Sequence, residues 1–175
     1  RFVAARAFAS LQDPSAIPQL SGLLEDPVEE VRCVAAYALG QIGAREGVDP
    51  LIRAFDGADT LGLNHRFNGQ VLEAVGKCGG KDHLQLISTV QNYQRQDTFL
   101  MDGQARAIYR FGLRGIILPE GTERMLFLLS DQAMPPLARL YAANYFKRME
   151  GLGLSEAQEE KLVQLMRREN SASVR

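Results

Sequence analysis

Apolar residues recur along the chain at the spacing of amphipathic helices. The clearest stripe is made of small and branched residues at i, i+3, i+4 and i+7 positions: Val31, Val34, Ala35, Ala38 and Ile42. This spacing places all of them on one face of a helix. Gly43 follows directly and can adopt the left-handed conformation that ends a helix without a Cβ clash. The pattern therefore predicts one amphipathic helix that ends near Gly43.

A second, shorter apolar stripe follows this turn. It predicts a helix over about residues 46–55 with four inward-facing side chains: Val48, Leu51, Ile52 and Phe55. Asp26 and Pro27 precede the first helix; Asp can cap a helix, and Pro fits the first helical position because its φ is already set. Residues 26–62 therefore form one predicted pair of short helices.

This helix pair repeats along the chain. Arg1, Val3 and Ala4 match Arg32, Val34 and Ala35 at a constant offset of 31 residues, and further copies follow at offsets of 36 and 33. A fifth copy lies 107 residues after the second. We expect a single domain of five units: residues 1–25, 26–62, 63–95, 96–130 and 131–170. One helix pair cannot bury its apolar face alone, so the units must stack.

Composition supports an all-α fold. The chain has 23 Leu and 20 Ala against 10 Val and 7 Ile, with no Trp, and Leu and Ala favour helices over strands. The high apolar content and the net charge of -1 exclude disorder. No apolar run reaches ten residues, and the richest, Met125 to Leu129, has five, so no run is long enough to span a membrane.

The charge of the chain limits the class of partner that it can bind. A near-neutral chain lacks the basic footprint of a nucleic-acid-binding protein. Residues 1–62 carry 5 basic and 9 acidic side chains, whereas residues 63–118 carry 7 and 4, so the middle is mildly basic.

Cys33 and Cys78 lie inside helical patterns and are expected in the core, which leaves the redox compartment and the localisation open. The chain begins at Arg1 with no leader, so we expect a fragment of a longer protein.

The second unit also resembles a known repeat. Asp26-Pro27, Val31-Arg32, the run from Ala35 to Gly43 and the run from Val48 to Ile52 are similar to the bacterial HEAT repeat in its phycobilisome-lyase-like subtype. The resemblance implies an all-α, right-handed α-α superhelix, an α-solenoid of about five helix pairs. It also implies a non-catalytic scaffold that binds another protein.

Two alternatives rest on further resemblances. The stretches 72–79 and 108–115 are similar to segments of large bacterial peptidyl-prolyl isomerases, in which helical repeats accompany a cyclophilin-like domain. This chain would then present the substrate, since it contains no cyclophilin barrel. The second alternative is a HEAT-like bilin lyase. A HEAT-like DNA glycosylase fits poorly, because the chain has no Trp and no basic cleft is indicated.

Candidate catalytic and ligand-binding motifs are weak throughout. The stretch 76–81 is rich in Gly and Lys, but Val75 and Asp82 stand where a Walker loop needs Gly and Ser or Thr, so we interpret it as a helix-to-helix turn. Cys78, His65 and His83 do not supply a zinc ligand set, and no motif flanks either His as in a nucleophilic triad. We therefore predict no catalytic residue, no cofactor and no metal.

Arginines supply the remaining candidates. Arg32 recurs as Arg1, Arg106 and Arg139, which indicates a repeated structural task. The resemblance to HEAT repeats implies a ladder in which these arginines pair with acidic side chains of adjacent units, such as Asp26 or Asp131; the alternative is a ligand contact. The middle of the chain interleaves basic and aromatic residues: Tyr93, Arg95, Phe99, Arg106, Tyr109, Arg110, Phe111 and Arg114. Arg106 and Arg110 share one polar helix face while Ala107 and Phe111 point inward.

The binding candidates are therefore of two kinds. Arg106, Arg110 and Arg114 would contact an acidic partner or peptide, as an alternative to forming a solvated face. Gln19, Arg53 and Gln85 occupy polar positions of the second helices, which form the binding surface of HEAT arrays. The partner is expected to be a protein or peptide, with no nucleic acid and no membrane span. The oligomeric state stays open.

Overall fold

The chain is described by a computed structural model covering residues 1–59, 62–90 and 97–168. Within these ranges the structure is helical, with no strand. The α-helices are α1 (Phe2–Leu11), α2 (Ile17–Gly22), α3 (Glu29–Ile42), α4 (Val48–Ala54), α5 (His65–Cys78), α6 (Lys81–Ser88), α7 (Thr98–Leu113), α8 (Pro119–Ser130), α9 (Pro136–Arg148) and α10 (Glu156–Arg168). Three 3₁₀ turns, η1 (Pro14–Ala16), η2 (Leu23–Glu25) and η3 (Arg45–Gly47), lie next to α2 and α4.

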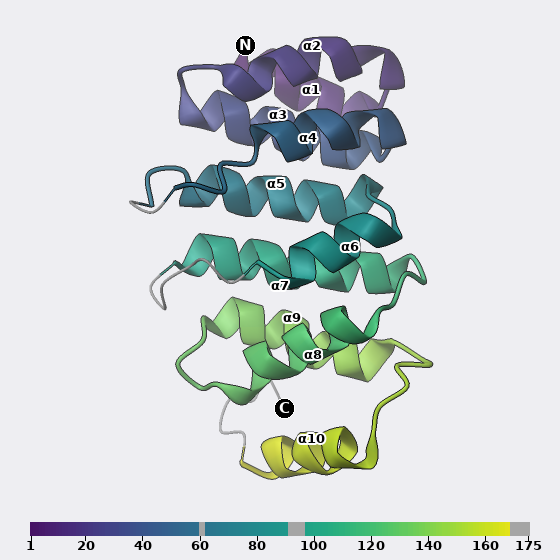
Figure 1. Cartoon of the computed structure of the whole chain (residues 1–175). Coiled ribbons are helices and arrows are strands. Elements are labelled where there is room, and N and C mark those ends of the chain that lie inside the picture. The colour runs from purple at the N-terminus through teal and green to yellow at the C-terminus, as the bar shows by residue number, and fades with distance from the viewer. Residues whose placement is uncertain (60–61, 91–96, 169–175) are drawn as a thin grey trace.

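The helices form two stacked layers. The odd-numbered helices α1, α3, α5, α7 and α9 lie side by side like the rungs of a ladder, and α2, α4, α6 and α8 cross in front of them (Figure 1). Each of these shorter helices packs mainly against the odd-numbered helix that follows it. The predicted all-α solenoid of helix pairs is confirmed. We call the two sides the first-helix face and the second-helix face.

Small residues set the distance between the first-layer helices. A Cβ atom added to Gly103 of α7 would lie 2.3 Å from the carbonyl oxygen of Gly69 of α5. One added to Gly76 would lie 2.5 Å from the Cα of Ala107, and one added to Gly40 would lie 2.8 Å from the Cα of Ala74. The backbones therefore touch directly, and α5 and α7 form the most extensive helix pair of the stack.

Local signals at the start and end of helices were predicted with mixed success. Gly43 ends α3 with φ of 70°, as its position predicted. The prediction for Pro27 is wrong, because α3 begins at Glu29 and the Asp26 carboxylate instead accepts a hydrogen bond from the Val28 amide at 2.9 Å. Asp26 thus stabilises the turn before the helix. In the last unit Pro136 does occupy the first helical position.

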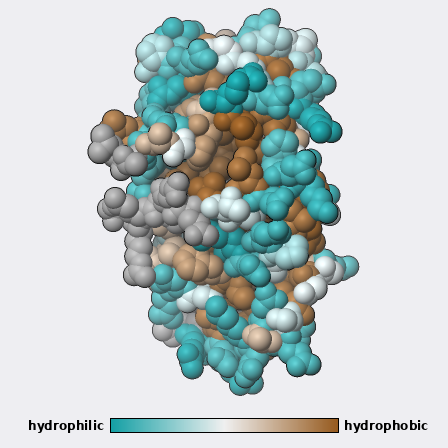
Figure 2. All heavy atoms as spheres, in the orientation of Figure 1, coloured by the Kyte–Doolittle hydropathy of each residue, from teal (hydrophilic) through white to brown (hydrophobic). Residues whose placement is uncertain are grey.

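The second layer is interrupted between α4 and α6. These helices lie well apart on either side of α5 (Figure 1), and apolar side chains are exposed in a hollow between them (Figure 2). This hollow has a volume of about 190 Å³ and is lined in part by Phe55, Leu86, Val90 and Leu100. At the end of the stack α10 contributes only half-buried Leu162 and Leu165, while Met166 is exposed. Of the helices that the structure describes, none is long and apolar enough to cross a membrane.

Candidate functional site

A carboxylate surrounded by cations lies on the first-helix face. Glu73 of α5 is buried, with only 11% of its side chain exposed. Its Oε2 lies 2.9 Å from Nη1 of Arg106, and its Oε1 lies 3.5 Å from Nζ of Lys77 and 4.0 Å from Nη2 of Arg110. The three cations outnumber the one carboxylate, so this Glu73 cluster has an excess of positive charge.

Lys77 connects the cluster to α3. Its Nζ donates a hydrogen bond to Oε1 of Gln41 at 2.9 Å and lies 4.9 Å from the centre of the Tyr37 ring. Burial lowers the pKa of Lys77, and the charges of Arg110 and Arg106 add to that effect, while Glu73 opposes it. Glu73 and the Tyr37 ring therefore stabilise the charged form of Lys77 against the cost of its partial burial.

The arginines connect the cluster to α7 and α9. Arg106 lies 5.7 Å from the centre of the Tyr141 ring, with 32% of its side chain exposed, and Arg110 has 39% exposed. Burial acts to lower the pKa of Arg106, but the hydrogen bond and charge of Glu73 outweigh it and raise the pKa. Asp102 also faces Arg106, and burial raises the pKa of its carboxyl group. The guanidinium groups of Arg106 and Arg110 are therefore partly open to solvent.

An open groove adjoins the Glu73 cluster on the same face. It has a volume of about 540 Å³ and runs across α1, α3 and α5. Its lining combines cationic and apolar side chains: Phe2, Arg6, Ala9, Cys33, Val34, Tyr37, Gln41, Arg66 and Gln70, among others. Arg66 pairs with Glu30 at 3.6 Å across the groove, although both side chains are about half exposed. Tyr37 and Gln41 belong both to the groove and to the contacts of Lys77, so the two features are continuous.

The cysteines are expected to react slowly. Burial raises the pKa of both the Cys33 and the Cys78 thiol to about 11, with the charge of Glu29 adding to the effect at Cys33. At pH 8 the thiolate fraction should be about 100-fold lower than that of a thiol of pKa 9.0, the reference value. Titration with a chromogenic disulfide should show this slow reaction in buffer and a fast one in concentrated guanidinium. Reaction of the native chain at the denatured rate would contradict it. Cys33, half-buried beside the groove, should react before the buried Cys78.

The predicted arginine ladder is only partly present. Arg1 pairs with the Asp26 carboxylate of the next unit at 3.0 Å, and Arg106 pairs with Glu73, as a ladder between units requires. Arg32 does not bind the Asp26 carboxylate. Its guanidinium donates to the backbone carbonyl of Asp26 at 3.0 Å and to the side-chain oxygen of Asn64 at 3.1 Å.

The four arginines are also not equivalent. By the offsets of 36 and 33 residues, Asn68 and Met101 are the positions equivalent to Arg32 in the third and fourth units. Arg106 is instead equivalent to Glu73. Arg106 therefore lies on a different helix face from Arg32. Arg139 is level with Arg32 but is buried in α9. The prediction treated Arg106 as the equivalent of Arg32 because both are arginines. Arg106 lies five positions after the equivalent residue, Met101, and five positions along a helix lead to a different face.

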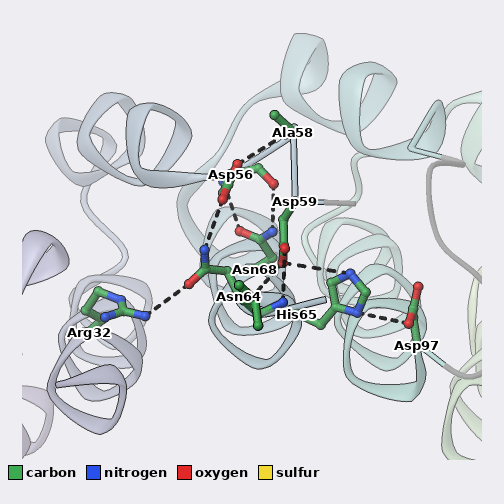
Figure 3. A network of polar contacts seen from close by, with 9 residues as sticks. Arg32, Asp56, Ala58, Asp59, Asn64, His65, Asn68 and Asp97 are labelled. Carbon is green, nitrogen blue, oxygen red and sulfur yellow. Dashed lines mark hydrogen bonds and ion pairs between the residues drawn. The ribbon is translucent and has the colours of Figure 1, made fainter. Parts of the chain in front are cut away.

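A polar network anchors the loop before α5 (Figure 3). Asn68, almost fully buried, accepts a hydrogen bond from the Asp56 amide at 2.9 Å and donates to the Asp56 carbonyl at 2.8 Å. Asn64 donates to the Asp56 carboxylate at 2.9 Å and accepts from Arg32. Asn68 stands where the repeat has Arg32, and its side chain fixes the backbone of the loop instead of pairing with an acid.

His65 lies between two carboxylates in the same network (Figure 3). Its Nδ1 is 2.9 Å from Asp97, and its Nε2 is 3.8 Å from Asp59. Asp59 in turn accepts hydrogen bonds from the amides of Leu63 and Asn64 at 3.0 and 2.6 Å. Because both ring nitrogens face carboxylates, His65 is arranged to hold the loop against α7 and not to activate a nucleophile.

Other predicted residues are dispersed. Gln19, Arg53 and Gln85 are exposed on α2, α4 and α6 of the second-helix face, and Gln85 donates to Glu120 at 3.4 Å. Arg114 is exposed at the end of α7, where it donates to the Gly76 carbonyl at 3.2 Å. Tyr93 and Arg95 fall outside the described residues. Within the ranges that the structure covers, no group of three His, Cys, Asp or Glu side chains could hold a metal ion.

The predicted placement of the arginine stripe on α7 was correct. Arg106 and Arg110 lie on the polar face, while Ala107 and Phe111 are fully buried. The groove, Lys77 and Glu73 were missed. One signal was available, because the 33-residue offset makes Glu73 and Arg106 equivalent positions of adjacent units, and equivalent positions of stacked helices face each other.

Comparison with known proteins agrees with this architecture. Residues 1–61 match HEAT repeats. The match covers α1 to α4, the part of the chain in which the repeated pattern is clearest. HEAT repeats commonly mediate protein interactions and are generally non-enzymatic. No curated protein matches the chain. The match and the helix pairs of the structure together support a HEAT-repeat type of helical fold.

Proposed function

We propose that this chain is a non-catalytic HEAT-repeat scaffold that binds another protein, as one domain of a larger bacterial protein. The observation that carries the proposal is the continuous groove and Glu73 cluster on the first-helix face. This surface crosses four consecutive first-layer helices and combines apolar walls with partly exposed cations. Such an extended surface across repeats suits a peptide or protein segment better than a small substrate.

Display selection tests the scaffold function without knowledge of the partner. The folded chain is immobilised, and binders are selected from a random peptide library, with the heat-unfolded chain as the matched control. We expect one or a few related sequences to be enriched on the folded chain and to compete with each other for a single site. Recovery of unrelated sequences, equally on folded and unfolded chain, would contradict the proposal.

A substrate-presenting role in a peptidyl-prolyl isomerase is the alternative with a specific sequence basis. The stretches 72–79 and 108–115, which carry that resemblance, lie at the ends of α5 and α7. Gly76 of the first stretch packs against Ala107, the residue directly before the second, and Arg114 of the second donates to the Gly76 carbonyl at 3.2 Å. These contacts give Gly76 a structural role. In a proline isomerisation assay we expect the isolated chain to leave the uncatalysed rate unchanged. Acceleration above background would overturn the non-catalytic proposal.

The bilin lyase alternative rests on the similarity of the second unit alone. Incubation of the chain with a bilin and a phycobiliprotein subunit should form no covalent adduct. Adduct formation would favour this alternative over the scaffold.

A further inference from the structure

The groove and the Glu73 cluster form one surface with a defined charge. We name it the cationic surface and define it by Arg6, Tyr37, Arg66, Lys77, Arg106 and Arg110. Its five cations face three carboxylates, those of Glu30, Glu73 and Asp102, so the excess is 5 − 3 = +2. The whole chain has a net charge of -1, so the rest of it carries -1 − 2 = -3. Positive charge is therefore concentrated on this face of an otherwise acidic chain.

The cations keep hydrogen-bonding capacity that the fold does not use. Nε of Arg106 and Nε of Arg110 are buried and have no hydrogen-bond partner in the described structure. Only one nitrogen of Arg106 is within 3 Å of Glu73, and Arg110 approaches Glu73 only to 4.0 Å. The Nε atoms are not exposed, so a ligand carboxylate would contact the exposed part of each guanidinium group; 32% of the Arg106 side chain and 39% of the Arg110 side chain are exposed. Carboxylates are the partners that guanidinium groups bind best, often through two hydrogen bonds.

We propose that the cationic surface binds an acidic peptide segment of a partner protein, and this inference rests on the proposed scaffold function. The carboxylates of the segment contact Arg66, Arg106 and Arg110. An apolar side chain of the same segment occupies the groove, against Ala9, Val34 and the exposed Tyr37. Apolar contact supplies affinity, and the charges supply orientation and specificity.

A peptide fits this surface better than a nucleic acid does. A phosphate backbone needs a run of cations without intervening acids, since its affinity comes from neutralising many phosphates. Here Glu30 and Glu73 are interspersed among the cations and would repel a continuous backbone charge. A peptide can place its acidic residues opposite the arginines and its neutral residues opposite these carboxylates.

Fluorescence anisotropy with defined probes tests the inference. The first probe is a fluorescein-labelled 12-residue peptide of Asp and Glu around one Phe and one Leu. The second has Asn and Gln in place of every acidic residue, and the third is a single-stranded 12-mer of thymidine. We expect the acidic peptide to bind about tenfold or more tightly than the neutral one, and added salt to weaken it. We expect the oligonucleotide to bind more weakly than the acidic peptide.

Charge variants locate the site. Arg66→Glu and Arg110→Glu should each weaken the acidic peptide about tenfold, because each removes a charge-assisted contact. Arg110→Gln should weaken it in the same direction without placing a second carboxylate next to Glu73. Arg53→Glu on the second-helix face changes the net charge equally and should leave the affinity unchanged within about twofold. Circular dichroism and thermal unfolding confirm that each variant is folded.

Several results would overturn the inference. In the probe comparison, these results are no binding of the acidic peptide, equal binding of the acidic and neutral peptides, or tighter binding of the oligonucleotide than of the acidic peptide. Among the charge variants, it is a loss of affinity for the acidic peptide in Arg53→Glu but not in Arg110→Glu. The display selection separates this failure from failure of the scaffold itself. An enriched peptide family without acidic residues would leave the scaffold function standing and remove the acidic partner, whereas no enrichment at all would remove both.

Discussion

Gly103→Ala is expected to lower the free energy of unfolding by about 3 kcal/mol, which is a large part of the roughly 5–15 kcal/mol that stabilises a typical domain. The new Cβ atom would lie 2.3 Å from the carbonyl oxygen and 2.5 Å from the Cα of Gly69. Both are backbone atoms in the middle of α5, so no side chain can rotate away. The helices α5 and α7 would have to separate, and because they form the most extensive contact of the stack, the loss spreads along both.

Thermal and denaturant unfolding of Gly103→Ala should be compared with Gly22→Ala. Gly22 is the last residue of α2, has a helical conformation and has no atom within 4 Å of the position of an added Cβ. Alanine there should be neutral or stabilise the fold by up to about 1 kcal/mol, because it restricts the unfolded chain. If Gly103→Ala unfolds at the same denaturant concentration as the native chain, α5 and α7 do not pack by direct backbone contact.

The close approach of the first-layer helices was only partly predictable. The recurring Ala residues indicated that neighbouring helices lie close together. Gly76 was interpreted as part of a turn, whereas it lies inside α5 against Ala107, and the turn itself is made by Gly79 and Gly80. The offset of 36 residues from Gly40 to Gly76 shows that a helix-interior glycine recurs, and a recurring glycine in a helix signals a neighbouring backbone.

The fold class could be predicted because it depends on local periodicity and on a repeat length, both visible in one sequence. The site could be predicted only in part. The positions of Arg106 and Arg110 follow from helical spacing, but their contacts with Glu73 depend on how α7 stacks on α5. The groove depends on side chains from three helices at once, so no spacing within one helix reveals it.

The loop before α5 was unpredictable for a different reason. Most of its hydrogen bonds join residues 12 positions or fewer apart, but Arg32 and Asp97 also contact it from α3 and from the start of α7. Helical periodicity does not predict contacts of either kind. Asn68 occupies the position that Arg32 has in the preceding unit, and its side chain binds the Asp56 backbone. The residue that departs from the repeat therefore stabilises the loop that also departs from it.

Gln104→Leu is the second substitution for which we expect a large effect, a loss of about 3 kcal/mol in the free energy of unfolding. Gln104 of α7 is fully buried. Its amide donates to the carbonyls of Ile87 and Val90 at 2.8 and 2.9 Å, and its oxygen accepts from Nε of Arg124 at 2.8 Å. The Gln104 side chain therefore connects α7 by hydrogen bonds to the end of α6 and to the middle of α8.

The cost arises mainly at Arg124, because leucine fills the space of Gln104 but offers no acceptor. Arg124 is buried, and burial lowers the pKa of its guanidinium group to about 10, so its charge is already poorly solvated. The double variant Gln104→Leu/Arg124→Leu should lose less than the sum of the two single variants, by about 1–2 kcal/mol, since it removes donor and acceptor together. Denaturant unfolding of the four proteins measures this coupling, with exposed Gln85→Leu as a control that should change stability by less than about 0.5 kcal/mol. Strictly additive losses would mean that the Gln104–Arg124 hydrogen bond does not join α7 to α8.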